Sequence, residues 1–148
     1  MSHEVEIGRG KRGRRAYTLD DIALVPARRT RDPEDVNVGW QIDAYHVDLP
    51  LMAAPMDSVM SPETAIAFGR LGGIGVLDLD GLWTRYEDPE PILDQIAHLG
   101  EEESIATLQR VYSEPIKPTL ITERLTQLRE AGVVVAGKLS PQRVQQHW

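Results

Sequence analysis

The fold is decided by residues 49–79, whose sequence is L-P-L-M-A-A-P-M-D-S-V-M-S-P-E-T-A-I-A-F-G-R-L-G-G-I-G-V-L-D-L. Residues 49–56 are almost continuously apolar, as expected for a parallel strand that is covered on both faces. The triplet 61–63, S-P-E, predicts a helix start with an N-cap, a first-turn proline and a first-turn acid, and the glycines at 72–73 end that helix. Because a second apolar run follows at residues 74–79, the stretch predicts a strand, a helix and a parallel strand.

The helical pattern continues beyond this unit. Apolar residues at three- and four-residue spacing predict helices over residues 88–100, 101–112 and 119–132. Thr119 is the predicted N-cap of the last helix, and Gly132 stands where a left-handed residue ends a helix.

A β-branched run, V-V-V-A-G-K-L, predicts a third strand near residues 133–139. It joins the strands expected near residues 49–55 and 74–79. Ser140 and Pro141 then repeat the helix-start signature. Strands that alternate with helices predict an α/β protein with a parallel sheet, and the periodicity is compatible with a barrel or with a doubly wound sheet.

Composition limits the possible classes of protein. The 148 residues are 41% hydrophobic and 26% charged, which predicts one globular domain. The chain has no Cys, so these residues contain no disulfide, no thiolate zinc site and no cysteine nucleophile. His46, His98 and His147 share no metal-ligand spacing, so no metal site is expected. No stretch approaches the ~18 apolar residues of a membrane span, and we expect a cytoplasmic protein.

Charge is distributed unevenly along the chain. The net charge of −7 argues against general nucleic-acid binding, yet residues 1–31 contain eight basic and four acidic residues. Residues 1–16, which include G-R-G-K-R-G-R-R, have no apolar periodicity and predict a basic flexible arm. Such an arm can bind phosphate or RNA, but without interleaved aromatic residues we favour a solvated segment. The fold is expected to begin at Tyr17.

Three blocks of sequence resemble a known family in their order and spacing. They are T-L-D-D-I-A-L-V-P-A at 18–27, L-P-L-M-A-A-P-M-D-S-V at 49–59 and G-R-L-G-G-I-G-V-L at 69–77. These blocks resemble the inosine monophosphate dehydrogenase and guanosine monophosphate reductase family, especially its short actinobacterial-type members. The resemblance implies that residues 17–148 are the N-terminal part of a (β/α)8 TIM barrel with parallel strands, truncated after about three strands. A complete barrel of this kind takes roughly 250 residues.

The resemblance also implies where a ligand binds. The loop after the first strand lies against the bound nucleotide in the family, so Ala54 and Met56 map to positions that touch a purine monophosphate, with Asp57 supporting the loop. The residue types suit this role, because a small side chain lets backbone approach a ligand and Met offers an adaptable surface to a flat base. The alternative is that residues 53–56 only pack the barrel.

Asp78 departs from the family pattern. Dehydrogenases of the family commonly carry His near the substrate at the end of the second strand, where this chain has Asp. A desolvated carboxylate there would repel an anionic nucleotide by ~1 kcal/mol or more, which counts against ordinary IMP oxidation. The alternative role for Asp78 is a cap or a solvated turn in the segment 78–81, D-L-D-G.

The glycines at 72, 73 and 75 do not form a dinucleotide-binding fingerprint. They follow a helix and precede a strand, which is the reverse of the order that the fingerprint requires. We therefore interpret them as turn and packing residues.

The resemblance implies a function in purine (guanine) nucleotide metabolism. The parent enzyme would oxidise IMP to XMP with NAD, or use NADP, and assemble as a homo-oligomer, a tetramer in the family. The family's attacking cysteine, phosphate loops and flap are not found in these residues, so no catalytic residue is assigned and the chain alone is predicted to be inactive. The connection before the third strand is too short for the regulatory CBS module of many relatives. The alternatives are GMP reductase, or a non-catalytic purine-nucleotide-binding or oligomer-interface protein.

Overall fold

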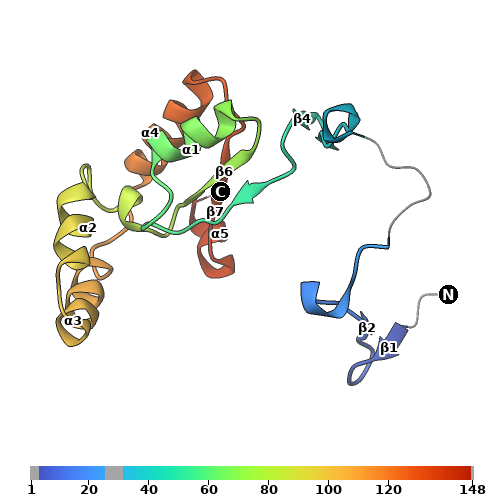
Figure 1. Cartoon of the computed structure of the whole chain (residues 1–148). Helices are drawn as coiled ribbons and strands as arrows, with labels where there is room; N and C mark the ends of the chain where they lie inside the picture. The colour runs from blue at the N-terminus through green and yellow to red at the C-terminus, as the bar shows by residue number, and fades with distance from the viewer. Residues whose placement is uncertain (1–3, 26–31, 148) are drawn as a thin grey trace. The chain divides into compact units, whose positions relative to one another are not determined.

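The computed structural model describes residues 4–25 and 32–147 (Figure 1). The chain divides into two compact units, Met1–Asn37 and Val38–Trp148.

The first unit contains a short hairpin and two helical turns. Strand β1 (Glu4–Glu6) pairs antiparallel with β2 (Arg12–Arg14), and the 3-10 turns η1 (Leu19–Asp21) and η2 (Pro33–Asp35) follow. This hairpin in the basic segment is not predicted from the sequence. It forms because Gly8 and Gly10 adopt positive φ angles of 69° and 71° and reverse the chain. The flexibility of the basic arm stays a prediction.

A second hairpin, also not predicted, opens the second unit. Strand β3 (Trp40–Ile42) pairs antiparallel with β4 (Tyr45–Val47) across a two-residue turn. Asp43 in this turn has a φ of 49°, a left-handed conformation that Asp tolerates better than most residues.

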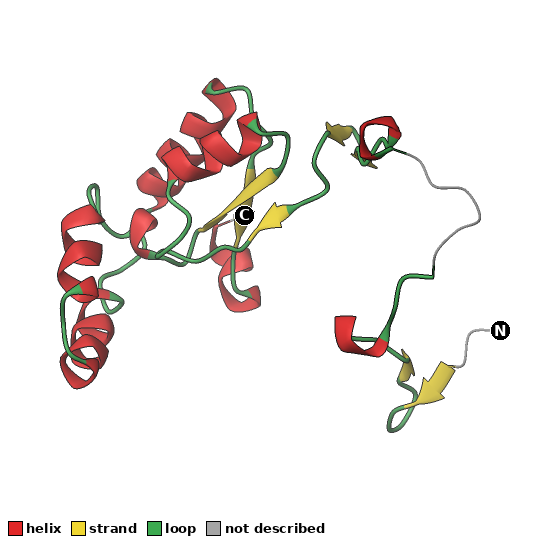
Figure 2. Ribbon diagram, in the orientation of Figure 1, coloured by secondary structure: helices red, strands yellow, loops and turns green. Residues whose placement is uncertain are grey.

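Three parallel strands form the sheet of the second unit. Strands β5 (Met52–Ala53), β6 (Ile74–Asp78) and β7 (Ala136–Lys138) are ordered β5-β6-β7, with β6 in the centre (Figures 1 and 2). The α/β class and the three neighbouring parallel strands are thus confirmed. Strand β5 is shorter than predicted because Pro50 and Pro55, which lack a backbone N–H, flank it.

Helix α1 (Pro62–Arg70) connects β5 to β6 and packs against β6. The Ser61 hydroxyl accepts a hydrogen bond from the Thr64 N–H at 3.1 Å, as the S-P-E signature predicts. Gly72 ends the connection with a φ of 93°. Glycine is required at 75 in β6, because a Cβ there would lie 2.5 Å from the Ala65 backbone. The close approach brings α1 onto the sheet.

The core lies between the sheet and the helices that connect its strands. Helix α4 (Pro118–Glu130) packs against α1, and both helices lie on the same side of the sheet (Figure 1). The buried apolar cluster here consists of Met60, Ala65, Leu77, Leu79, Ile121 and Leu128. Burial of this surface stabilises the second unit by the hydrophobic effect.

The N-cap predicted for α4 is wrong by two residues. The helix begins at Pro118 with Lys117 as its N-cap, and not with Thr119. Proline favours the first helical position and keeps the preceding residue extended, and Lys117 has a ψ of 112°. The Lys117 N–H donates to the Thr84 carbonyl at 2.8 Å, which anchors this start. Gly132 has the predicted left-handed conformation, with a φ of 74°.

Two further helices, which we call the helix pair, lie between β6 and α4 in the sequence. A 3-10 turn, η3 (Leu82–Thr84), leads into α2 (Glu90–Ala97) and α3 (Glu101–Val111), which contact each other. The last helix, α5 (Pro141–His147), starts at the predicted Ser140–Pro141 signature. Within the described ranges, no helix has the length and apolar character needed to cross a membrane.

Candidate functional site

A cavity of about 450 Å³ lies beyond the carboxyl ends of β5 and β6, and we call it the strand-end pocket. It contains three of the four predicted site residues, Met56, Asp57 and Asp78. Ala54 is exposed two residues before Met56 and does not line it. The lining residues are Pro55, Met56, Asp57, Ser58, Asp78, Leu82, Leu93, Ile96, Leu108 and Tyr112.

Apolar side chains from the helix pair complete the strand-end pocket. Leu93 and Ile96 come from α2 and Leu108 from α3, while Met56 comes from the loop after β5. A mainly apolar cavity with a few polar groups is typical of a small-molecule site. Both helices are predicted from the sequence, but their place in the site is not. Their helical apolar spacing was visible, but the spacing does not show which surface the helices cover.

Asp57 connects the loop after β5 to two distant segments. Its Oδ2 accepts hydrogen bonds from the Leu82 N–H at 2.8 Å and from the Tyr112 hydroxyl at 2.5 Å. Its Oδ1 is buried against Gly81, where an added Cβ would lie only 2.1 Å away. The loop-supporting position expected for Asp57 therefore has a concrete geometry. The carboxylate fixes the loop to η3 and to the end of α3.

The buried environment of Asp57 favours the protonated carboxyl more than water does. Burial raises the pKa of the Asp57 carboxyl, and the hydrogen bonds from Tyr112 and Leu82 oppose that shift. Burial also raises the pKa of the Tyr112 hydroxyl, and the hydrogen bond to Asp57 acts in the same direction. The Tyr112 hydroxyl is therefore neutral and is the donor in its hydrogen bond to Asp57. Sequence reasoning missed this residue as part of the site.

Arg85 reinforces the attachment of the helix pair. Its guanidinium donates to the Asp80 carbonyl at 2.9 and 3.2 Å and to the Glu114 carbonyl. It also lies 5.6 Å from the centroid of the Tyr112 ring, within the range of a cation–π contact. Arg85 thus bridges the turn after β6 and the segment after α3, and it holds the wall of the strand-end pocket in place.

Asp78 is paired. Its two carboxylate oxygens accept from Lys138 Nζ at 3.2 and 3.3 Å, and Oδ1 also accepts from the Asp80 N–H at 3.0 Å. The hydrogen bond from the Asp80 N–H lies within the D-L-D-G turn, which is the alternative role expected for Asp78. Asp78 therefore both lines the pocket and caps this turn. Lys138 is not among the site residues predicted from the sequence. Its position near the end of the third predicted strand was the available signal.

The glycines after α1 serve packing, as predicted. A Cβ at Gly73 would lie 2.4 Å from the Phe68 ring, and one at Gly75 would meet Ala65. They do not form a cradle for the phosphates of a dinucleotide. The strand-end pocket has two carboxylates among its lining residues, Asp57 and Asp78. Within the residues described by the structure, no group of three His, Cys, Asp or Glu side chains is arranged to hold a metal ion.

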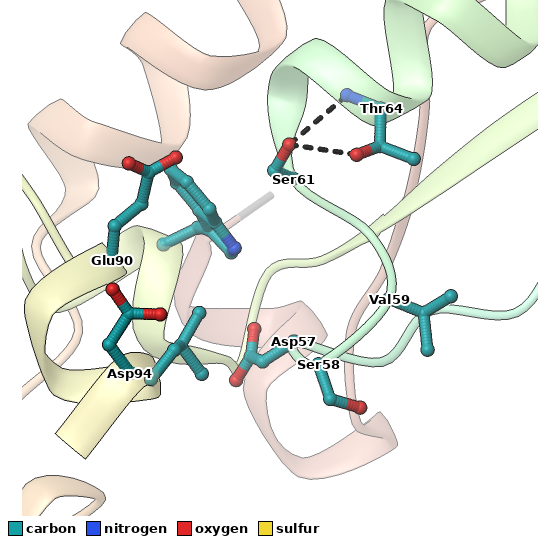
Figure 3. Close-up of a pocket in the computed structure, with 9 residues that line it drawn as sticks. Asp57, Ser58, Val59, Ser61, Thr64, Glu90 and Asp94 are labelled. Carbon is teal, nitrogen blue, oxygen red and sulfur yellow. Dashed lines mark hydrogen bonds between the residues drawn. The ribbon is translucent and has the colours of Figure 1, made fainter. Parts of the chain in front are cut away.

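A second cavity of about 370 Å³ shares Asp57, Ser58 and Leu93 with the strand-end pocket. Ser61 and Thr64 at the start of α1 lie on one side of it, with Glu90 and Asp94 of α2 on the other (Figure 3). Its lining also includes Val59 and Trp83. The three carboxylates make this cavity acidic, so it is less suited to phosphate than the strand-end pocket.

The comparisons with known proteins agree on one family. Residues 16–85 match the family model of the IMP dehydrogenase / GMP reductase domain. The crystal structure of an IMP dehydrogenase/GMP reductase-like protein from Corynebacterium glutamicum is similar to this chain with a TM-score of 0.81 and 42% identity. That similarity covers 97% of this chain and 40% of the other.

Two sequence relatives are similarly informative. An "uncharacterized oxidoreductase" of Mycolicibacterium smegmatis is 43% identical over 95% of this chain and 39% of that protein. An inosine-5'-monophosphate dehydrogenase of Methanocaldococcus jannaschii is 41% identical over 43% of this chain and 13% of that protein. The chain thus spans about two fifths of the length of the mycobacterial relative.

Proposed function

The chain belongs to the IMP dehydrogenase/GMP reductase family, and from that premise we propose that its strand-end pocket binds a purine nucleoside monophosphate. The observation that carries this proposal is the meeting of the loop after β5 with the end of β6 in one mainly apolar cavity. Ligands of parallel α/β folds bind at the carboxyl ends of the strands, which is where this cavity lies.

Each proposed contact has a physical role. Met56 is 50% exposed and lines the pocket, so its polarizable thioether is accessible to a flat base. Ala54 does not line the pocket, but its small side chain keeps the backbone next to the pocket loop accessible. Asp57 holds the loop in position through Leu82 and Tyr112. Asp78 contributes a carboxylate whose charge is balanced by Lys138.

For the longer protein we propose an oxidoreductase of purine nucleotide metabolism that oxidises IMP to XMP with NAD and assembles as a homo-oligomer. NADP and the reverse direction, GMP reduction, are the alternatives within the family. Because the glycines after α1 serve packing, we place the binding groups of such a cofactor in the remainder of the longer protein. Between β6 and β7 the chain forms η3 and helices α2 to α4, which supports a form without a CBS module.

For this chain taken alone we propose binding without turnover. The absence of Cys favours this second candidate, because the family attacks the purine with a cysteine thiolate. A purine-nucleotide-binding portion of an enzyme and a non-catalytic binding protein both fit this description. They differ in whether the longer protein contains the cysteine.

The test is an NMR titration of the 148-residue chain, in which the methionine methyl signals are followed while IMP, GMP or CMP is added. We expect the purine nucleotides to shift the Met56 signal with a Kd of about 1 mM, since a partial pocket offers few contacts. Met56→Ala should weaken binding, whereas Met52→Ala is the matched control, because Met52 is 60% exposed and lies outside the pocket lining. Equal shifts with IMP and CMP, or equal effects of the two variants, would contradict the proposal.

A further inference from the structure

A lysine lies beside the pocket carboxylate at the same level of the sheet. Asp78 is the last residue of β6, Lys138 is the last residue of β7, and the two are partners in the parallel register. Lys138 Nζ is 3.2 and 3.3 Å from the two Asp78 oxygens. The Asp78 side chain is 18% exposed and the Lys138 side chain 45% exposed, so water screens this pair only in part.

The backbone around Lys138 is held firmly in this register. The Lys138 carbonyl accepts from the Leu79 N–H at 3.0 Å, and the Ser140 N–H donates to Asp80 Oδ2 at 2.7 Å. Gly137 permits the contact, because a Cβ there would lie 2.6 Å from the Leu79 side chain. The backbone of Lys138 is therefore fixed next to Asp78, and the Lys138 side chain extends from that position.

Asp80, a neighbouring carboxylate, is paired with Arg143. Arg143 Nε lies 3.5 Å from Asp80 Oδ1, while Lys138 Nζ is 3.7 Å from Asp80 Oδ2. Since Arg143 compensates Asp80, the charge of Lys138 is directed mainly at Asp78, to which it is closer. Asp80 does not line the strand-end pocket, whereas Asp78 does. The compensation of the Asp78 charge in the pocket thus depends mainly on Lys138.

We propose that Lys138 is the specificity-determining residue that lets the strand-end pocket accept an anionic ligand, because it neutralises the Asp78 carboxylate. Without it, an unpaired carboxylate in a mainly apolar cavity would repel a phosphate monoester and leave an uncharged nucleoside unaffected. That the anion is a nucleotide phosphate rests on the proposed function. The effect of Lys138 on the charge of the pocket is independent of the proposed function.

The first experiment measures that charge without any nucleotide. Small nitroxide probes, one carrying a carboxylate and one an ammonium group, are added to the chain, and the relaxation of the Met56 methyl signal is recorded. The measured quantity is the relaxation of the Met56 methyl caused by the anionic probe divided by that caused by the cationic probe. Lys138→Gln and Lys138→Met should each lower this ratio by about twofold or more. Lys138→Arg should keep the wild-type ratio, and Asp78→Asn/Lys138→Met should restore it. Met60, which is 2% exposed, shows in each variant whether the core is intact.

Arg129→Met is the matched control for removal of one positive charge. Arg129 is exposed in the last turn of α4, which precedes β7 and therefore lies toward the opposite end of the sheet. We expect its ratio to equal that of the wild type. If Lys138→Gln and Lys138→Met give the same ratio as Arg129→Met, the proposal is wrong.

The second experiment separates this proposal from the proposed function. Titrations with IMP and with inosine should show that Lys138→Gln weakens IMP binding about tenfold and changes inosine binding less than twofold. Equal losses for both ligands would contradict a charge-based role for Lys138. If wild-type chain binds neither ligand, the proposed function fails, and the nitroxide ratios alone decide the role of Lys138.

Discussion

The Tyr112 hydroxyl lies 2.5 Å from Asp57 Oδ2, so the end of α3 is tied to the loop after β5 across 55 positions of sequence. Together with Arg85, this contact attaches the α2–α3 pair to the strand ends. The strand-end pocket is formed between the two segments that it joins. Its integrity therefore depends on a hydrogen bond that can be removed without changing the size of a side chain.

Tyr112→Phe removes only the hydroxyl. We expect the free energy of unfolding to fall by about 1–2 kcal/mol, because the half-buried Asp57 carboxylate loses one of its two donors. Urea denaturation followed by circular dichroism measures the change. Tyr45→Phe in the exposed part of β4 is the control, and it should have an effect below about 0.5 kcal/mol. An equal effect of the two variants would show that the Asp57 contact does not stabilise the fold.

Stability should also depend on pH through Asp57. Burial raises its pKa above the ordinary value of 3.8, so the Asp57 carboxyl binds more protons in the folded than in the unfolded chain between 3.8 and that higher pKa. The contribution of Asp57 to the stability of the folded state therefore falls as pH rises through this window. It stays at its lower value above the folded-state pKa.

The Asp57→Asn variant lacks this titration. The difference in unfolding free energy, wild type minus Asp57→Asn, should decrease as pH is raised from 4 toward neutrality. Denaturation midpoints in a series of buffers at constant ionic strength measure it. A difference that is constant, or that grows with pH, would mean that burial does not dominate the pKa of Asp57.

Local signals made much of this fold predictable. The Ser61 cap, the three apolar runs and Gly132 each act through neighbours a few residues away, and the corresponding elements form as expected. The site was less predictable, because its polar contacts join residues far apart. Asp57 meets Tyr112 across 55 positions, and Asp78 meets Lys138 across 60. Periodicity identifies the helices and strands that carry these residues but not the pairs that packing brings together.

The same distinction explains the errors. The β3–β4 hairpin depends on Asp43 in a left-handed conformation, which the sequence favours only weakly. The start of α4 depends on Pro118 and on the contact between Lys117 and Thr84, which is 33 positions away. The family resemblance located Met56, Asp57 and Asp78, and the structure shows that they line one cavity.

Gly81→Ala tests the packing behind Asp57. The new Cβ would lie 2.1 Å from Asp57 Oδ1, so the carboxylate has to move and its bonds to Leu82 and Tyr112 weaken. We expect a loss of about 2–3 kcal/mol in unfolding free energy and a shift of the Met56 methyl signal. Gly100→Ala is the matched control, because a Cβ at 100 meets nothing within 4 Å and should cost less than about 1 kcal/mol. Similar losses in both variants would refute a special requirement at position 81.

The chain alone is expected to form no NADH from IMP and NAD. The family's chemistry needs a thiolate that attacks the purine C2 before hydride transfer, and this chain has no Cys. Absorbance at the nicotinamide band, recorded for the purified chain and for a boiled sample, measures turnover. NADH above the boiled control would mean that a residue other than cysteine serves as the nucleophile, and the assignment of binding without turnover would have to be withdrawn.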